Sequence, residues 1–133
     1  MKKLIIIIIF IIIGLLIKIP KYEELNNLAI INTIAINNKN GKVTLILKEI
    51  VPKKNDNGID YDYTYYKSTS NSIDKALVNI KSKTKKKIYL QKCKYLILDK
   101  TTSENIINKL NIKPKYIIHT HKNINTYIKR DYY

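Results

Sequence analysis

An uninterrupted apolar run near the amino terminus constrains this chain more than any other feature. Met1-Lys2-Lys3 is followed by Leu4–Ile17, fourteen uncharged residues of which nine are isoleucine. A short basic head before an apolar stretch is the layout of an export signal. No small-x-small cleavage site follows this run, and the only Cys, Cys93, lies far from it, so no Cys is available there for lipid attachment. We therefore interpret the run as an uncleaved signal anchor, with everything after Pro20 outside the cytoplasm.

The length of the run leaves two other interpretations open. Fourteen helical residues reach about 21 Å, whereas the hydrocarbon core of a bilayer is about 30 Å thick. A cleaved export signal and a buried helix of a soluble protein also have this length. Lys3 and Lys18 can extend the span by snorkelling. Thirteen strongly apolar residues contribute about −4 to −8 kcal/mol to insertion, which favours the membrane anchor.

The formal charge of +15 points to nucleic acid or to another anionic surface. Of the 25 basic residues, however, 24 are lysine, whereas specific phosphate readers favour the planar fork of arginine. The densest basic run comprises Lys81, Lys83 and Lys85–Lys87, at an expected helix end where cations suit the helix dipole. We interpret it as a solvated face and expect no nucleic acid as partner. Contact of this face with anionic lipid, wall polymer or nucleic acid is the alternative.

Hydrophobic and polar residues alternate in three consecutive segments after the anchor. Period 2 is the pattern of a half-buried strand, and Gly41 supplies the positive φ of a tight hairpin turn. We predict strands at 28–37, with Leu28, Ile30, Ile34 and Ile36 on one face, at 43–48, and at 61–66. A turn at Asn38–Gly41 and a loop at Pro52–Gly58 connect them.

The period then changes from 2 to 3.6. Ser72 is a suitable N-cap for a helix that ends near Lys83, because apolar residues follow at i, i+3, i+4 and i+7. A strand at 88–98, a second helix from Thr102 or Ser103, a strand at 115–120 and an irregular polar tail complete the pattern. The order β-β-β-α-β-α-β predicts an α+β domain, a mixed sheet with two helices on one face. The expected division is an anchor at 1–20, the domain at 21–122 and the tail at 123–133.

Few residues in the chain are suited to catalysis or metal binding. His119 and His121, the only histidines, lie on one face of an expected strand, but a zinc site needs three or four ligands. Cys93 lies in an expected strand and is interpreted as a small buried hydrophobe. The close acidic pairs Asp60/Asp62 and Glu23/Glu24 lie in polar connecting stretches, so we interpret them as solvated surface rather than acid/base couples. We predict no catalytic, cofactor-binding or metal-binding residues, no cofactor and no enzymatic activity.

The segment Tyr61–Tyr66 contains four tyrosines in six positions. Such a segment can stack the bases of a single-stranded nucleic acid. Aromatic side chains are also common in strands, where they pair with neighbours across the sheet. We favour the second interpretation, in which the tyrosines form part of the sheet surface.

Several short motifs follow one another in an order that resembles a known family, the Ger(x)C lipoproteins, which are the C subunits of spore germinant receptors. The resemblance is to their N-terminal domain and covers roughly Tyr22–His121. It implies an α+β domain that docks on receptor subunits and has no enzymatic activity. The motifs that carry it are Glu24-Leu-Asn-Asn-Leu-Ala-Ile-Ile31, Ile34-Ala-Ile-Asn37, Lys42-Val-Thr-Leu-Ile-Leu47, Tyr66-Lys-Ser-Thr-Ser-Asn-Ser-Ile-Asp-Lys-Ala-Leu77, Lys87-Ile-Tyr-Leu90 and Lys94-Tyr-Leu-Ile-Leu98.

The chain departs from this family in three respects. Lys18-Ile-Pro-Lys21 stands where the family carries a lipobox Cys, Ala35 and Ser70 replace family glycines, and the family's larger C-terminal part does not follow. We therefore expect a protein anchor to replace the lipid anchor. The resemblance implies a single-pass protein of the cell membrane with an extracytoplasmic domain, a role in spore germination, and multi-spanning receptor subunits as partners. No small-molecule ligand is assigned.

Overall fold

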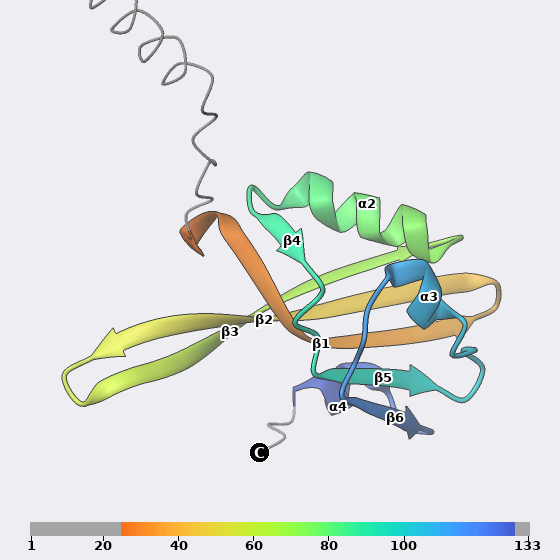
Figure 1. Cartoon of the computed structure of the whole chain (residues 1–133). Coiled ribbons are helices and arrows are strands. Elements are labelled where there is room, and N and C mark those ends of the chain that lie inside the picture. The colour runs from red at the N-terminus through yellow and green to blue at the C-terminus, as the bar shows by residue number, and fades with distance from the viewer. Residues whose placement is uncertain (1–24, 130–133) are drawn as a thin grey trace, which may run out of the picture.

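The computed structural model describes residues 25–129 of the 133-residue chain. The chain folds into a twisted sheet with helices on both of its faces (Figure 1). Its elements are η1 (Leu25–Asn27), β1 (Leu28–Lys39), β2 (Lys42–Asn55), β3 (Gly58–Ser70), α2 (Ile73–Lys83), β4 (Lys87–Tyr89), β5 (Tyr95–Asp99), α3 (Ile106–Leu110), β6 (Tyr116–Thr120) and α4 (Ile124–Ile128).

The strands are ordered β3-β2-β1-β5-β6, and the short strand β4 pairs with the first part of β1. β1, β2 and β3 are antiparallel neighbours, whereas β4 and β5 run parallel to β1, and β6 runs parallel to β5. The parallel strands are joined by connections that contain helices, as parallel pairing requires. The predicted α+β class and the mixed sheet are therefore confirmed.

The two hairpins are longer than the sequence pattern indicated. Asn40 and Gly41 both have positive φ, as in a type I′ turn, and join β1 to β2 as predicted. The predicted loop at Pro52–Gly58 is wrong over most of its length, because β2 continues to Asn55 and β3 begins at Gly58. The ladder between β2 and β3 extends from Val43↔Ser70 to Asn55↔Gly58. Polar residues are tolerated there because both faces of this part of the ladder are exposed.

A β-bulge at Asn32 divides β1 into two parts of opposite phase. Ile31 pairs with Glu49 and Thr33 pairs with Lys48, so Asn32 is an extra residue in β1. Before the bulge Ala29 and Ile31 face the main core, and after it the even-numbered residues Ile34 and Ile36 do. The prediction that Leu28 and Ile30 share a face with Ile34 and Ile36 is therefore wrong. An extra residue reverses the side to which every preceding side chain points.

The predicted single strand at 88–98 is two strands, because the chain turns between Leu90 and Cys93. The Cys93 N–H donates to the Leu90 carbonyl at 2.9 Å, and the Lys94 N–H donates to the Asn32 carbonyl at 2.7 Å. β4 pairs with β1 before the bulge and β5 pairs with it after the bulge. The turn at 90–94 and the bulge at Asn32 are thus two parts of one irregularity.

The larger part of the core lies between the sheet and the helices α2 and α3. The Ser72 side chain accepts a hydrogen bond from the Lys75 N–H at 3.3 Å, so the predicted N-cap is confirmed. Ile73, Ala76 and Ile80 of α2 are buried against the apolar side chains of β1, β2 and β5. Burial of one such isoleucine contributes about 1.5–3 kcal/mol. The second predicted helix is shorter than expected: the chain makes successive tight turns from Asp99, and α3 begins at Ile106.

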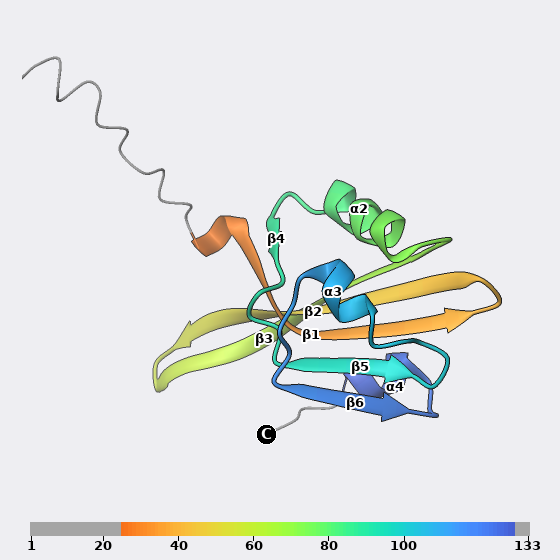
Figure 2. The same ribbon diagram turned by 45° about the vertical axis from the view of Figure 1, so that its right-hand side comes forward.

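The opposite face of the sheet carries a helix that the sequence analysis missed. Ile124 and Ile128 of α4 are 1 % exposed and pack on Ala35, Ile46 and Ile97. Figures 1 and 2 show α4 on the side of the sheet away from α2 and α3. The two predicted helices do share one face, as α2 and α3. The prediction of an irregular tail, however, is wrong for residues 124–128, which form a third helix on the other face. A pair of isoleucines four positions apart is too short a pattern to indicate a helix.

No helix within residues 25–129 has both the length and the apolar character needed to cross a bilayer. The predicted anchor at 1–20 lies outside the described residues. Glu23 and Glu24 also lie outside them.

Candidate interaction surface

The β2–β3 hairpin extends beyond the rest of the sheet as a two-stranded arm. The last residue pair of β1 with β2 on this side is Ile31↔Glu49, after which β2 and β3 pair only with each other. We call residues 50–63 the arm. Figures 1 and 2 show it projecting away from the remaining elements. Its six β2 residues, at about 3.3 Å each, give it a length of about 20 Å.

The arm exposes apolar and aromatic side chains at its tip. Ile59 is 70 % exposed and Tyr61 is 54 % exposed. The Asn55 side chain accepts a hydrogen bond from the Asn57 N–H at 3.0 Å, and Gly58 has a φ of 136°, which together close the tip. Lys53 forms an exposed ion pair with Asp62 across the two strands at 3.6 Å. A two-stranded hairpin is marginally stable by itself, so the arm depends on the sheet at its base.

At the base of the arm, one residue from each of five strands forms a row across the sheet. Tyr116 pairs with Tyr95, Tyr95 with Thr33, Thr33 with Lys48, and Lys48 with Tyr65. We call these five residues the tyrosine row. Directly paired residues point to the same side of a sheet, and Thr33 lies two positions before Ala35, so the row lies on the α4 face.

Stacking and cation–π contacts order the side chains of the tyrosine row. The rings of Tyr95 and Tyr116 stack with centroids 5.3 Å apart. The Lys48 ammonium lies 4.0 Å from the Tyr63 ring centroid and 5.9 Å from that of Tyr65. Such contacts contribute about 0.5–2 kcal/mol each, depending on exposure. Tyr65 and Tyr116, at the two ends of the row, remain 40 % and 44 % exposed. The predicted cross-strand pairing of the tyrosines is thus confirmed for Tyr65.

A charged cluster lies on the other face at the base of the arm. The Lys86 ammonium contacts one Glu49 carboxylate oxygen at 2.6 Å, and the Tyr66 hydroxyl donates to the other oxygen at 2.6 Å. The Glu49 side chain is 2 % exposed. Burial, together with the hydrogen bond to Glu49, raises the pKa of the Tyr66 hydroxyl. The cluster attaches the chain that follows α2 to β2 and β3.

This cluster corrects the interpretation of the basic run. Lys81, Lys83, Lys85 and Lys87 are exposed, whereas Lys86 is turned inward onto Glu49. The sequence analysis missed the cluster because the partners are 37 positions apart. A charged pair, Lys48-Glu49, in the middle of the apolar run Val43–Val51 was the available signal, since buried charges need partners.

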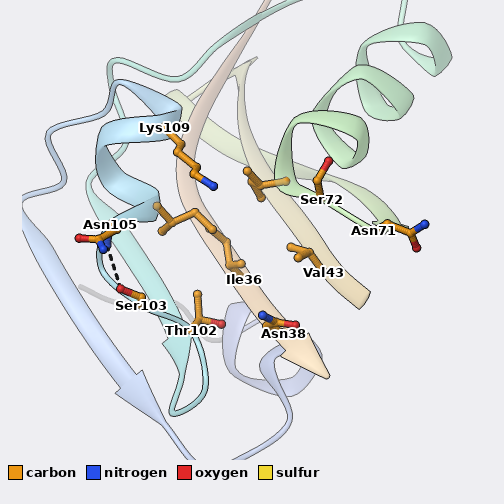
Figure 3. A pocket seen from close by; sticks show the side chains of 11 residues that line it. Ile36, Asn38, Val43, Asn71, Ser72, Thr102, Ser103, Asn105 and Lys109 are labelled. Atoms are coloured by element: carbon orange, nitrogen blue, oxygen red, sulfur yellow. Dashed lines mark hydrogen bonds between the residues drawn. The ribbon is translucent and has the colours of Figure 1, made fainter. Parts of the chain in front are cut away.

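Figure 3 shows a groove between the amino-terminal end of α2, the turn-side ends of β1 and β2, and α3. Its volume is about 410 Å³. Ile36 and Val43 form part of its floor, whereas Ser72, Asn105 and Lys109 lie on its rim (Figure 3). Ser72 is already engaged as the helix cap, and Asn105 N–H donates to the Ser103 hydroxyl at 3.4 Å. The groove has an apolar base and an amide- and hydroxyl-rich margin.

The structure separates the two histidines. His119 lies on β6 and its Nε2 is 2.9 Å from a Glu104 carboxylate oxygen, whereas His121 lies beyond the end of the strand. The prediction that both lie on one strand face is therefore wrong for His121. Within the part of the chain that the structure describes, His, Cys, Asp and Glu form no group of three that could hold a metal ion.

The remaining candidates occupy different environments. Cys93 is buried as predicted, but in the turn between β4 and β5 rather than in a strand. Burial raises the pKa of its thiol to about 12, so the reactive thiolate is disfavoured. Asp60 and Asp62 are exposed on the arm, where the Asp60 carboxylate accepts a hydrogen bond from the Tyr61 N–H at 2.8 Å.

In a comparison with known families, the family described as the spore germination protein N-terminal domain matches residues 21–112. This range contains β1 to β5, both helices of the larger core and the arm. The resemblance inferred from the short motifs is thereby confirmed. Searches of curated proteins and of solved structures returned no match.

Proposed function

The chain belongs to the family of spore germination protein N-terminal domains, and on this premise we propose that it is a membrane-anchored, non-enzymatic receptor accessory in spore germination. In this proposal the residues after Pro20 form an extracytoplasmic domain. The domain acts by docking on multi-spanning receptor subunits in the same membrane. The germination role follows from the family, whereas anchoring and docking are the proposed steps.

One observation above all supports docking through the sheet: the tyrosine row is ordered yet incompletely covered. α4 covers the neighbouring row formed by Ala35, Ile46 and Ile97, but Tyr65 and Tyr116 remain substantially exposed. Tyrosine provides a large rigid contact area with a polar end, and it is enriched at protein interfaces. The row is therefore a suitable centre for a protein contact.

The leader supports the anchoring step. In the Ger(x)C lipoproteins, which the chain resembles, a lipid on a Cys holds the domain at the membrane. Here Leu4–Ile17 supplies enough apolar surface for a protein anchor, and the first described element begins only eight residues after this run ends. Either kind of anchor would keep the domain close to the outer face of the membrane, where membrane-embedded partners are accessible.

Site-specific photocrosslinking of the full chain in its native membranes tests the docking step. A photoreactive residue at Tyr65 should crosslink to an integral membrane protein with several spans, and the same residue at Val78 should not. Val78 is a matched control because it is 61 % exposed but lies on α2, across the sheet from the tyrosine row. Crosslinks at Val78 but not at Tyr65 would overturn the assignment of the surface.

Salt separates this proposal from the alternative of a basic module. A contact centred on aromatic area should persist from about 0.05 M to about 0.5 M salt, because it does not depend on exposed charge pairs. Binding to an anionic polymer through Lys81, Lys83 and Lys85 should collapse over the same range. Loss of the Tyr65 crosslink at high salt would favour the basic module.

A further inference from the structure

We propose that the tip of the arm lies in the headgroup layer of the membrane that holds the leader. The tip comprises residues 52–61, and its occupant is the lipid–water interface itself. This inference rests on the proposed membrane anchor. It adds a second, non-covalent contact with the membrane and thereby fixes the orientation of the domain.

Topology places the arm and the entry of the chain at the same end of the sheet. β1 begins at Leu28, and β2 runs antiparallel to it, back toward that beginning. β2 then continues past its last pairing partner in β1, Ile31, for six residues. The arm therefore projects from the end at which the chain arrives from the leader. In Figures 1 and 2 both η1 and the arm lie opposite the β1–β2 turn.

The length of the connecting chain is compatible with this contact. Seven residues, 18–24, separate the apolar run from η1. At no more than about 3.6 Å per residue they can span about 25 Å. The arm is about 20 Å long. An anchor that ends at the membrane surface therefore keeps that surface within reach of the arm.

The side chains at the tip are of the kinds that favour a lipid interface. Tyrosine is enriched at both membrane–water interfaces, because its ring is apolar and its hydroxyl is polar. Tyr61 pairs with Pro52 across the ladder, and Ile59 lies two positions nearer the tip on β3. All three residues are exposed. Ile59 is the most exposed of the large apolar side chains within residues 25–129. Pro52, Ile59 and Tyr61 share one side of the ladder, and adjoining exposed apolar side chains of this kind mark protein or membrane contact sites.

Charge argues against recruitment of the arm by anionic lipid. The arm carries two lysines, Lys53 and Lys54, and three aspartates, Asp56, Asp60 and Asp62. It is thus slightly acidic in a chain with a formal charge of +15. We therefore assign the contact to partition of apolar and aromatic groups into the interface, which is insensitive to salt and to the charge of the lipid.

A single tryptophan can report this contact, because the chain contains none. The full chain is reconstituted into phosphatidylcholine vesicles, and Tyr61→Trp is compared with Val78→Trp. Brominated phosphatidylcholine, with bromine near the headgroup, quenches an indole that lies in the interface. Flotation of the vesicles first establishes that the protein is seated in them, and circular dichroism establishes that each variant is folded.

The proposal predicts about twofold quenching for Tyr61→Trp and almost none for Val78→Trp, since only the first residue lies at the interface. Addition of phosphatidylglycerol or of salt should leave this difference unchanged. Flotation without quenching at residue 61, or quenching at residue 78 instead, would overturn the inference while leaving the anchor intact. Failure to float would overturn the anchor itself, and with it this inference.

Discussion

The buried carboxylate of Glu49 forms an ion pair with the partly exposed Lys86, with 2.6 Å between the Lys86 ammonium and a Glu49 carboxylate oxygen. The Tyr66 hydroxyl donates to the second oxygen, so the carboxylate has a partner on both oxygens. The pair joins β2 to the chain between α2 and β4. The pair lies where the arm leaves the sheet, so it helps to hold β2 and β3, the two strands of the arm, against the core.

Loss of one partner of this pair should destabilise the domain. Lys86→Met leaves the Glu49 carboxylate buried with only the Tyr66 hydroxyl, and the breaking of buried pairs costs about 3–5 kcal/mol. The Lys86 side chain is 34 % exposed, so water can replace part of its contribution, and we expect a loss of about 2 kcal/mol. Urea unfolding of the full chain in detergent micelles measures it.

A double-mutant cycle tests whether the loss comes from the pair itself. The double variant Glu49→Gln/Lys86→Met should lose at least about 1 kcal/mol less unfolding free energy than the sum of the two single variants. The reason is that the double variant lacks both charges, so no unpaired charge remains. Lys85→Met, one residue away and exposed, is the matched control and should change stability by less than about 0.5 kcal/mol. Additive effects would show that the two side chains do not interact.

Cys93 should resist modification as long as the domain is folded. Burial raises the pKa of its thiol from 9.0 to about 12, which lowers the thiolate fraction at neutral pH by about 1,000-fold. Labelling with iodoacetamide at pH 8 should therefore be slow in the native protein and fast in urea. Rapid labelling without denaturant would show that the turn between β4 and β5 is open.

The same raised pKa predicts a pH dependence of stability. The folded state favours the protonated thiol, so its contribution is intact below pH 9 and is lost as pH rises toward 12. Over that interval the wild-type chain should lose unfolding free energy faster than Cys93→Ala, which has no thiol to ionise. Parallel pH profiles for the two proteins would contradict the burial of this thiol.

The helix α4 should be part of the folded unit rather than a dispensable tail. Ile128→Ala removes a side chain that is 1 % exposed and packs on the sheet, at an expected cost of about 2–4 kcal/mol. Thr126→Ala, on the exposed side of the same helix, should change stability by less than about 0.5 kcal/mol. Thermal unfolding of both variants measures the difference, and equal midpoints would contradict the packing of α4.

The bulge at Asn32 should determine which side chains of β1 face the core. Deletion of Asn32 would move Ala29 and Ile31 to the opposite face and bring Leu28 and Ile30 into the core, with an expected loss of more than about 3 kcal/mol. Asn32→Ala keeps the extra residue and its backbone carbonyl, so it should cost less than about 1 kcal/mol. Similar urea midpoints for the two variants would show that the bulge carries no information about register.

The sequence pattern correctly predicted those features that are determined by residues close together in the chain. The N-cap at Ser72, the apolar stripe of α2 and the positive φ at Gly41 depend on residues within one turn or one hairpin. The family resemblance likewise came from short motifs in a fixed order, and the match over residues 21–112 confirms it.

The features that sequence reasoning missed have non-local causes. The bulge at Asn32 contacts the turn at 90–94, which lies about 60 positions later in the sequence, through the hydrogen bond from the Lys94 N–H to the Asn32 carbonyl. No glycine or proline marks either site. The inward position of Lys86 depends on Glu49, which a periodicity analysis cannot pair with it. The continuation of β2 through Pro52 was hidden because polar residues on a two-sided, exposed ladder have the composition of a loop.

Alkaline extraction of membranes that contain the full chain tests the central claim most directly. The account predicts that carbonate-washed membranes retain the polypeptide, with an intact amino end that includes Leu4–Ile17. The result that would contradict it is release of the chain into the supernatant, or a mature amino end that begins beyond Pro20.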